Sequence, residues 1–220
     1  MIHLWSFNIK LLSESKARSI ITSEEYNRAK LFSRREDQQR SMFGRAGIRL
    51  ALSEYYRTDP SSFSLSLEVN RPPQLLFSCA PYLSLSHAGN QILIGLSDKP
   101  IGVDIEPIIF YKELPDMEEL VFHPAEKELS KSILDFQSRL DYFFWCWTAK
   151  EAYLKGLGIG LMRKLPCIRL STKSGAILDP ITTSSWYVDR LNVEHGYMAA
   201  FASTYKKPSL HMHNLSEKCR

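Results

Sequence analysis

The chain has 220 residues, enough for one large domain or two small packed ones. Hydrophobic residues make up 44% of it, and no apolar run is long enough to cross a bilayer. The net charge of +4 is too small to indicate nucleic acid, and it fits an anionic substrate or an acidic protein partner. A secretion signal and metal-type cysteine spacing are both absent, so we expect a cytosolic protein with reduced thiols and no membrane partner.

The first part of the chain predicts a strand followed by helices. Residues 2–9 carry β-type side chains, whereas residues 23–32 and 36–57 have helical patterns. Residues 58–83 are rich in turn residues and short apolar runs, which is typical of loops and short strands. Residues 82–107 then predict two or three strands, broken at 88–90 and 98–100.

The second part of the chain returns to the same order of elements. Residues 116–158 form the longest helical stretch and predict two or more helices, and residues 167–179 and 184–203 predict further strands. No sequence repeat accompanies this order, so duplication is only a hint. We divide the chain into halves at residues 1–100 and 101–220.

Two acids stand side by side in "IGVDIEP", residues 101–107. In an extended strand Asp104 and Glu106 share one face, while the apolar residues between them share the other. The plain interpretation is a half-exposed strand whose carboxylates lie in water. Taken alone, this stretch favours that interpretation.

A third acid, Glu151, lies inside an apolar helical stripe. The stripe consists of Leu140, Phe143, Phe144, Trp147 and Leu154. A carboxylate among aromatic side chains costs several kcal/mol unless a cation, a metal or a proton compensates it. An ion pair with Lys155, four residues further on, is the structural alternative.

If the strand faces this helix, three carboxylates and a lysine converge. Asp104, Glu106 and Glu151 would repel one another unless a divalent cation lay between them, and oxygen ligands favour magnesium. Magnesium commonly takes its other ligands from substrate phosphates and water. The pattern therefore indicates chemistry on a pyrophosphate.

Other stretches offer contacts for anions. Ser86 and His87 lie at the end of a predicted strand, where they can donate to phosphate oxygens, although a lone histidine is more often structural. Arginines could clamp phosphates or lie on a solvated helix face; they are Arg28, Arg40, Arg45 and Arg49. The glycines at 156, 158 and 160 follow a helix, so they predict a helix end and a loop rather than a nucleotide-binding turn.

The two acid-bearing segments together resemble a known family. "IGVDIEP" and "FFWCWTAKEAYLKGLGIGL" are similar to the paired signatures (I/V)G(I/V)D(I/V)E and W(T/S)xKEAxxK of the 4′-phosphopantetheinyl transferases. The chain length resembles the longer, surfactin-synthetase-activating class. "SLSHAGN" and the "NRP" at 70–72 resemble further segments of that class, with Arg71 in place of a lysine. Glu25 stands where a relative has a basic contact to the coenzyme.

The resemblance implies an α+β fold of two similar halves related by a pseudo-twofold, with coenzyme A between them, in a monomer. It implies a Mg²⁺ ion held by Asp104, Glu106 and Glu151, and transfer of 4′-phosphopantetheine to a serine of an acidic apo carrier protein, releasing 3′,5′-ADP. Glu151 would act as general base and Lys155 on the leaving phosphate. The coenzyme contacts implied are Arg28, Ser41, Arg71, Ser86, His87, Asp104 and Lys155.

Three points stay open at this stage. Lys127 and Lys131 are candidates for contact with the carrier, or plain solvated charges. A magnesium-dependent nuclease or phosphohydrolase would also use an acid cluster beside a lysine. A protein that only binds coenzyme A is the non-enzymatic alternative. No nucleic-acid partner is expected.

Overall fold

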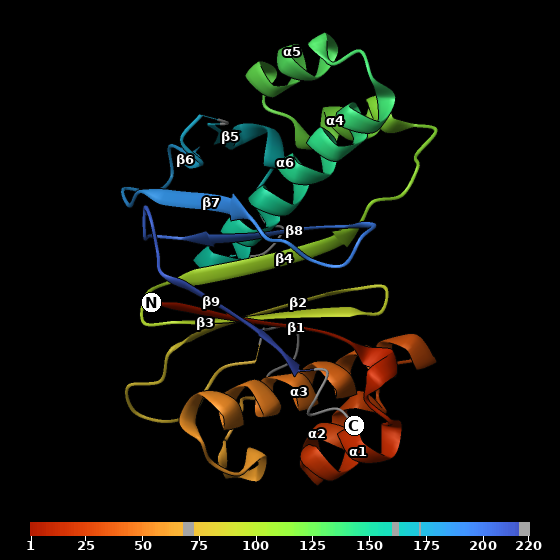
Figure 1. The fold of residues 1–220 in the computed structure, drawn as a ribbon, viewed down its shortest axis with the longest axis vertical. Helices are drawn as coiled ribbons and strands as arrows, with labels where there is room; N and C mark the ends of the chain where they lie inside the picture. The colour runs from red at the N-terminus through yellow and green to blue at the C-terminus, as the bar shows by residue number, and fades with distance from the viewer. Residues whose placement is uncertain (68–72, 160–162, 172, 216–220) are drawn as a thin grey trace. The chain divides into compact units, whose positions relative to one another are not determined.

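The computed structural model describes residues 1–67, 73–159, 163–171 and 173–215. It divides into two compact units: Met1–Asp98 with the C-terminal segment from Leu210, and Lys99–Ser209. Each unit consists of helices packed on a sheet, which confirms the predicted α+β class (Figure 1). No helix in the described part of the chain is long and apolar enough to span a bilayer.

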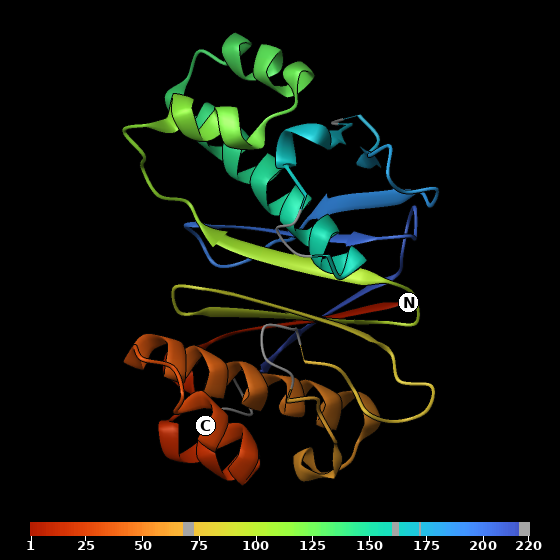
Figure 2. The same cartoon turned by 180° about the vertical axis from the view of Figure 1, so that it is seen from behind.

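The first unit is a four-stranded sheet with helices on one face. Its strands run in the order β2-β3-β1-β9, with β1 antiparallel to β3 and parallel to β9. The strands are β1 (Ile2–Asn8), β2 (Tyr82–Ala88), β3 (Gln91–Ser97) and β9 (Leu210–Asn214). The helices are α1 (Glu14–Ile20), α2 (Ser23–Ala29) and α3 (Arg35–Tyr56). Helix α3 lies along the sheet, and α1 and α2 pack against α3 (Figure 2).

Local signals set the ends of these elements. Thr22 and Glu25 form a capping box that begins α2, each side chain accepting a hydrogen bond from the other residue's backbone amide. A two-residue loop joins β2 to β3, and its Gly89 has a φ of 53°, the left-handed region that glycine adopts at little cost. This loop confirms the predicted break at 88–90. The predicted break at 98–100 is confirmed as well, because β3 ends at Ser97 and the next strand begins at Ile101.

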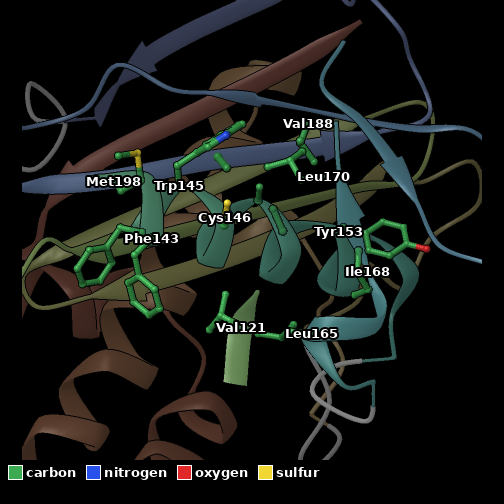
Figure 3. Close-up of a cluster of buried hydrophobic side chains, with 14 of the residues drawn as sticks. Val121, Phe143, Trp145, Cys146, Tyr153, Leu165, Ile168, Leu170, Val188 and Met198 are labelled. Atoms are coloured by element: carbon green, nitrogen blue, oxygen red, sulfur yellow. The ribbon is translucent and has the colours of Figure 1, made fainter. Parts of the chain in front are cut away.

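The second unit is a five-stranded antiparallel sheet in the order β4-β8-β7-β6-β5. The strands are β4 (Ile101–Pro107), β5 (Arg169–Leu170), β6 (Ala176–Leu178), β7 (Trp186–Arg190) and β8 (Tyr197–Ser203). The helices are α4 (Leu114–Val121), α5 (Pro124–Ser132) and α6 (Phe136–Leu157). Helix α6 lies across the sheet, and side chains such as Phe143, Tyr153 and Val188 fill the core around it (Figure 3).

A buried ion pair joins α6 to α5. Lys150 is fully buried and donates to Glu126 Oε2 at 2.5 Å and to the carbonyl oxygens of Val121 and Leu165. The other oxygen of Glu126 accepts from the backbone amide of Leu170 at 2.7 Å. A paired and fully hydrogen-bonded charge of this kind holds a unique arrangement of the segments around it. It fixes the helix one residue before Glu151.

Glycines allow β4 and α6 to approach closely. A Cβ atom on Gly102 would lie 1.8 Å from the carbonyl oxygen of Ala152 and 2.4 Å from the amide nitrogen of Gly156, so no other residue fits. Gly156 in turn lies against the ring of Trp186. Helix α6 then ends at Leu157, and its C-cap Gly158 has a φ of 70°, as the predicted helix end requires.

Candidate functional site

The candidate site of the second unit begins on the face of β4 that packs on α6. Alternation along the strand places Gly102, Asp104 and Glu106 on this face. Asp104 is only 2% exposed, and Glu106 at the end of the strand is half-buried. The carboxylates therefore do not lie in open water, which removes the plain interpretation of this strand.

Helix α6 supplies the other two charged groups. Glu151 and Lys155 lie one turn apart near its C-terminal end. Lys155 Nζ donates to Asp104 Oδ1 at 2.7 Å, so this ion pair joins the helix to the strand. Lys155, for which a pair along its own helix was the structural alternative, thus pairs across two elements. Asp104, Glu106, Glu151 and Lys155 lie together.

The electrostatics of the group reflect this crowding. Burial, and then the charge of Asp104, raise the pKa of Glu106 to about 7, against a partial offset from Lys155. Burial and Asp104 likewise raise the pKa of Glu151 to about 7. One lysine is too little positive charge for three acids, so at neutral pH the group holds protons that a stronger cation would displace.

A divalent cation fits this group by its chemistry. Glu151 Oε1 is buried and makes no hydrogen bond to any residue that the structure describes. Carboxylate oxygens are the ligands that magnesium prefers. Within the same described residues, no three His, Cys, Asp or Glu side chains are already arranged around a common metal position. Asp104, Glu106 and Glu151 are the residues that would hold the ion.

The first unit contains a separate basic pocket of about 320 Å³ beside α3. Its basic and hydroxyl groups are those of Arg28, Arg40, Ser41, Arg45 and His87, and its remaining walls are Phe32, Asp37, Pro73 and Leu85. Four cationic or imidazole side chains and one hydroxyl around one cavity suit a phosphate group. The aromatic and aliphatic walls suit a flat apolar ring.

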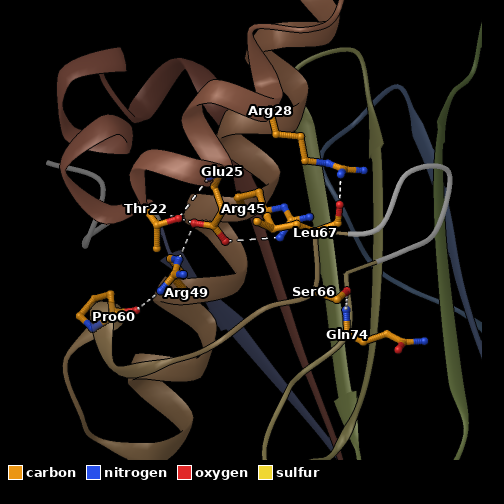
Figure 4. Close-up of polar contacts among 9 residues, drawn as sticks. All are labelled: Thr22, Glu25, Arg28, Arg45, Arg49, Pro60, Ser66, Leu67 and Gln74. Carbon is orange, nitrogen blue, oxygen red and sulfur yellow. Dashed lines mark hydrogen bonds and ion pairs between the residues drawn. The ribbon is translucent and has the colours of Figure 1, made fainter.

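A buried acid orders the arginines of α3 (Figure 4). Glu25, 2% exposed, accepts from Arg49 at 2.9 Å and from Arg45 at 3.4 Å. Arg49 also donates to the carbonyl oxygen of Pro60 at 2.9 Å and is 1% exposed, so it is a structural residue. Arg45 belongs both to this network and to the pocket wall. Glu25 therefore positions basic side chains of α3.

Comparisons with known proteins agree with this geometry. A model of the 4′-phosphopantetheinyl transferase superfamily matches residues 100–202, which include β4 and α6. The 4′-phosphopantetheinyl transferase Sfp of Bacillus subtilis is 26% identical over 85% of this chain and 84% of its own length. The 4′-phosphopantetheinyl transferase HetI of a Nostoc species is 29% identical over 91% of this chain and 86% of its own.

The chain is similar to the 4′-phosphopantetheinyl transferases over most of its length. This confirms the family resemblance predicted from the two signatures, and it makes the chain an enzyme of this transferase class. A solved holo-(acyl-carrier-protein) synthase from Bacillus anthracis, in complex with CoA (3′,5′-ADP), is 19% identical and matches 47% of this chain and 92% of its own, with a TM-score of 0.40. That likeness is too weak to place residues or ligands.

The coenzyme contacts predicted for this transferase lie in different places. Arg28, Ser41 and His87 line the pocket of the first unit. Ser86 does not line it, because β2 turns its side chain to the opposite face, where it is 4% exposed. Arg71 lies outside the described residues. The roles of all these residues stay predictions.

The predicted carrier contacts are not isolated positive charges. Lys127 pairs with Glu119, and Lys131 pairs with Glu128 at 2.8 Å. The transferase also contains pocket residues that the predicted contacts omit, above all Arg40 and Arg45. Both arginines were among those that the sequence offered for phosphate binding, and they recur at helical spacing with Asp37 and Ser41 on one face of α3.

Proposed function

We propose that this enzyme transfers 4′-phosphopantetheine from coenzyme A to a serine of an apo carrier protein, in a Mg²⁺-dependent reaction that releases 3′,5′-ADP. The observation that carries the proposal is the group in which Lys155 binds Asp104 beside Glu106 and Glu151. It combines excess carboxylate with one cation, the arrangement expected where a metal and a pyrophosphate bind together.

The second unit would bind the pyrophosphate of coenzyme A. A Mg²⁺ ion held by Asp104, Glu106 and Glu151 would neutralise the phosphate oxygens on which charge develops. Lys155, whose side chain is 32% exposed, can reach a phosphate from its place beside Asp104. We assign it to the leaving phosphate of 3′,5′-ADP, where a positive charge stabilises the transition state.

Glu151 is the residue best suited to accept a proton. The serine oxygen would attack the β-phosphorus, the bond from that phosphorus to the bridging oxygen of the pyrophosphate would break, and the serine proton would pass to Glu151. A general base works best when its pKa lies near the working pH, and the pKa of Glu151 is raised to about 7. Its Oε1, without a hydrogen bond to the described residues, can receive this proton.

The pocket of the first unit would bind the 3′-phosphate end of coenzyme A. Arg28 and His87 offer charge-assisted hydrogen bonds to the phosphate, and Ser41 adds a hydroxyl. Phe32 and Leu85 offer apolar surface to the adenine ring. We further infer that the enzyme belongs to the longer, surfactin-synthetase-activating class and acts as a cytosolic monomer on an acidic carrier.

The test is incubation with coenzyme A, Mg²⁺ and a panel of apo carrier proteins, followed by mass spectrometry of the carriers. We expect a mass gain of one phosphopantetheine on at least one carrier, loss of that gain with a chelator, and loss of it in Glu151→Gln. Glu128→Gln, an exposed acid on α5, is the matched control and should keep full activity. Unmodified carriers across the panel, with cleavage of nucleic acid or silent coenzyme binding instead, would overturn the proposal.

A further inference from the structure

Three histidines gather where the last strand of the first unit meets the first. Strands β1 and β9 run parallel, and their register pairs His3 with His211 and Trp5 with His213. All four rings lie on the side of the sheet that α3 covers, and α3 contributes Glu54 and Tyr55 to the same cluster. None of these residues belongs to the pocket or to the carboxylate group.

The cluster is connected by hydrogen bonds and stacked rings. His213 Nδ1 lies 2.8 Å from Glu54 Oε1, and His213 Nε2 lies 3.2 Å from His3 Nδ1. The ring centroids of His3 and His211 are 4.9 Å apart at an interplanar angle of 14°. The ring of His213 stacks on Trp5 at 4.6 Å. The ring of His3 is therefore within contact distance of both other histidine rings.

This geometry suits one proton and opposes a second. When His213 is protonated, its two N–H groups can donate to Glu54 and to His3 Nδ1, so both contacts are satisfied. A proton added to His3 Nδ1 would face the N–H of His213, and the hydrogen bond would be lost. His3 would then be a second cation, with a ring centroid 5.4 Å from that of His213.

The surrounding charges do not relieve this conflict. Burial, followed by the charges of His211, His213 and the amino terminus, lowers the pKa of His3. The amino terminus is paired with Asp98 at 2.9 Å, and Glu54 is the acid that α3 directs at the cluster. On β3 the residue opposite His3 is Leu96. Folding disfavours the charged form of His3. The stability of the fold is therefore unaffected by this group above the ordinary histidine pKa, and it decreases as the pH falls below that pKa.

Strand β9 is the element on which such a loss would act. It lies at the edge of the described sheet, next to β1, and most of its residues are exposed. Leu210 is 39% exposed and Met212 46%, so apolar burial holds this strand weakly. Leu215, directly after the strand, is 0% exposed in the core of the unit, so the strand is anchored at that end and is held along its length by the histidine cluster.

We propose that His3, His211, His213 and Glu54 form a pH-sensitive clasp that holds β9 on β1 at neutral pH and releases it when His3 gains a proton. The clasp opens in mildly acidic conditions by repulsion among the imidazolium rings. Trp5, the stacked neighbour of His213, becomes more accessible in the released state.

Hydrogen exchange of the whole protein, read by mass spectrometry at pH 7.5 and pH 5.5, tests the clasp. After correction for intrinsic rates, we expect the β9 amides to exchange about tenfold faster at the lower pH, equivalent to ~1.4 kcal/mol in the opening free energy. His3→Leu removes the second proton, so its β9 exchange should be equal at the two pH values. His195→Gln, at an exposed histidine of the second unit, is the matched control and should behave as the parent.

Two results would overturn the clasp. One is equal exchange of β9 at both pH values in the parent chain; the other is an undiminished rise in His3→Leu. If circular dichroism shows that His3→Leu does not fold, His211→Leu replaces it, because His211 is exposed and we expect its substitution to leave the fold intact. That variant should show a smaller rise than the parent, and a rise equal to the parent's would also count against the proposal.

Discussion

The two units share one plan and differ in what they place on its first strand. In each unit the first strand pairs antiparallel with the second strand of an antiparallel pair that follows the long helix, β1 with β3 of the pair β2–β3 and β4 with β8 of the pair β7–β8. The registers agree as well, since Ile2 lies opposite Ser97 and Ile101 lies opposite Ser203. The long helix of each unit, α3 or α6, has 22 residues. The hint of duplication from the order of elements is therefore visible as a repeated topology.

On this alignment Trp5 corresponds to Asp104, and Phe7 corresponds to Glu106. Trp5 is 0% exposed and Phe7 2%, and both pack in the core under α3. The fold thus allows aromatic side chains at these two positions, and they stabilise it by burial. Carboxylates at the same positions are costly. The fold therefore does not account for their presence in the second unit, and we attribute it to the proposed chemistry of the site.

The largest effect is expected where the two units differ in the closeness of helix and strand. Gly102→Ala would drive a methyl group into the backbone of α6, so we expect the second unit to lose more than ~3 kcal/mol of stability and the enzyme to lose its activity. Gly44→Ala, on α3, meets only the side chain of Leu85 at 3.2 Å and gains helix propensity, so its change should stay within about 1 kcal/mol.

Urea unfolding followed by circular dichroism measures both glycine variants. Comparable stability of the two would show that β4 and α6 can separate without cost, and that close packing does not position Glu151 beside Asp104.

The next largest effect is expected at Asp104, which occupies the position of Trp5 in the first unit. Asp104→Asn keeps the shape but removes the charge that binds Lys155, so we expect transfer to fall on the order of 10³-fold, or ~4 kcal/mol. The loss of this charge also removes one cause of the raised pKa of Glu106 and Glu151, so residual activity should rise at lower pH than in the parent. The pH profile of carrier modification measures both, and a residual profile that stays in place would contradict the coupling.

Much of the fold could be predicted because local signals were strong. The strand breaks, the helices α2 and α3 and the end of α6 follow from turn residues and apolar spacing. Helix α1 was missed because, unlike α2 of the same length, it has no capping box: its cap, Ser13, is followed three residues later by Lys16 and not by an acid. Strand β9 was missed because "LHMHN" is an exposed edge strand whose pattern is set by its neighbour β1. The first unit therefore includes the strand β9 from the C-terminal segment, whereas the predicted division between residues 100 and 101 placed that segment in the second half.

The site could be predicted only in part for a similar reason. Alternation on β4 and the misplaced polarity of Glu151 grouped the acids, but the partner of Lys155 depends on which element faces α6. The ion pair of Lys150 and Glu126 joins residues 24 apart and has no periodic signal. Ser86 and His87 were grouped as neighbours in sequence, although a strand turns neighbours to opposite faces.

A smaller effect is expected at the pocket of the first unit. Arg28→Gln should weaken coenzyme A binding about tenfold, because it removes a charge-assisted hydrogen bond to phosphate. It should change the affinity for coenzyme A lacking the 3′-phosphate much less. Arg18→Gln removes the same charge from a helix outside the pocket, where the guanidinium lies over the ring of Tyr26, and should leave both affinities unchanged. Calorimetry with the two ligands measures these affinities. Equal losses of affinity for both ligands in Arg28→Gln would show that Arg28 does not contact the 3′-phosphate.

The smallest effect is thermodynamic, and it separates the cost of the acids from their use. Because folding raises the pKa of Glu151 from its ordinary value of 4.5 to about 7, the folded chain binds more protons than the unfolded one between these pH values, and stability from this group is lost as the pH rises through that window. Glu151→Gln in chelator should therefore melt a few degrees above the parent at pH 8 and level with it near pH 4.5. Phe7, at the position of Glu106 in the first unit, bears no such cost at any pH. Thermal melts that show the same difference at both pH values would mean that packing, and not the buried charge, distinguishes the variant.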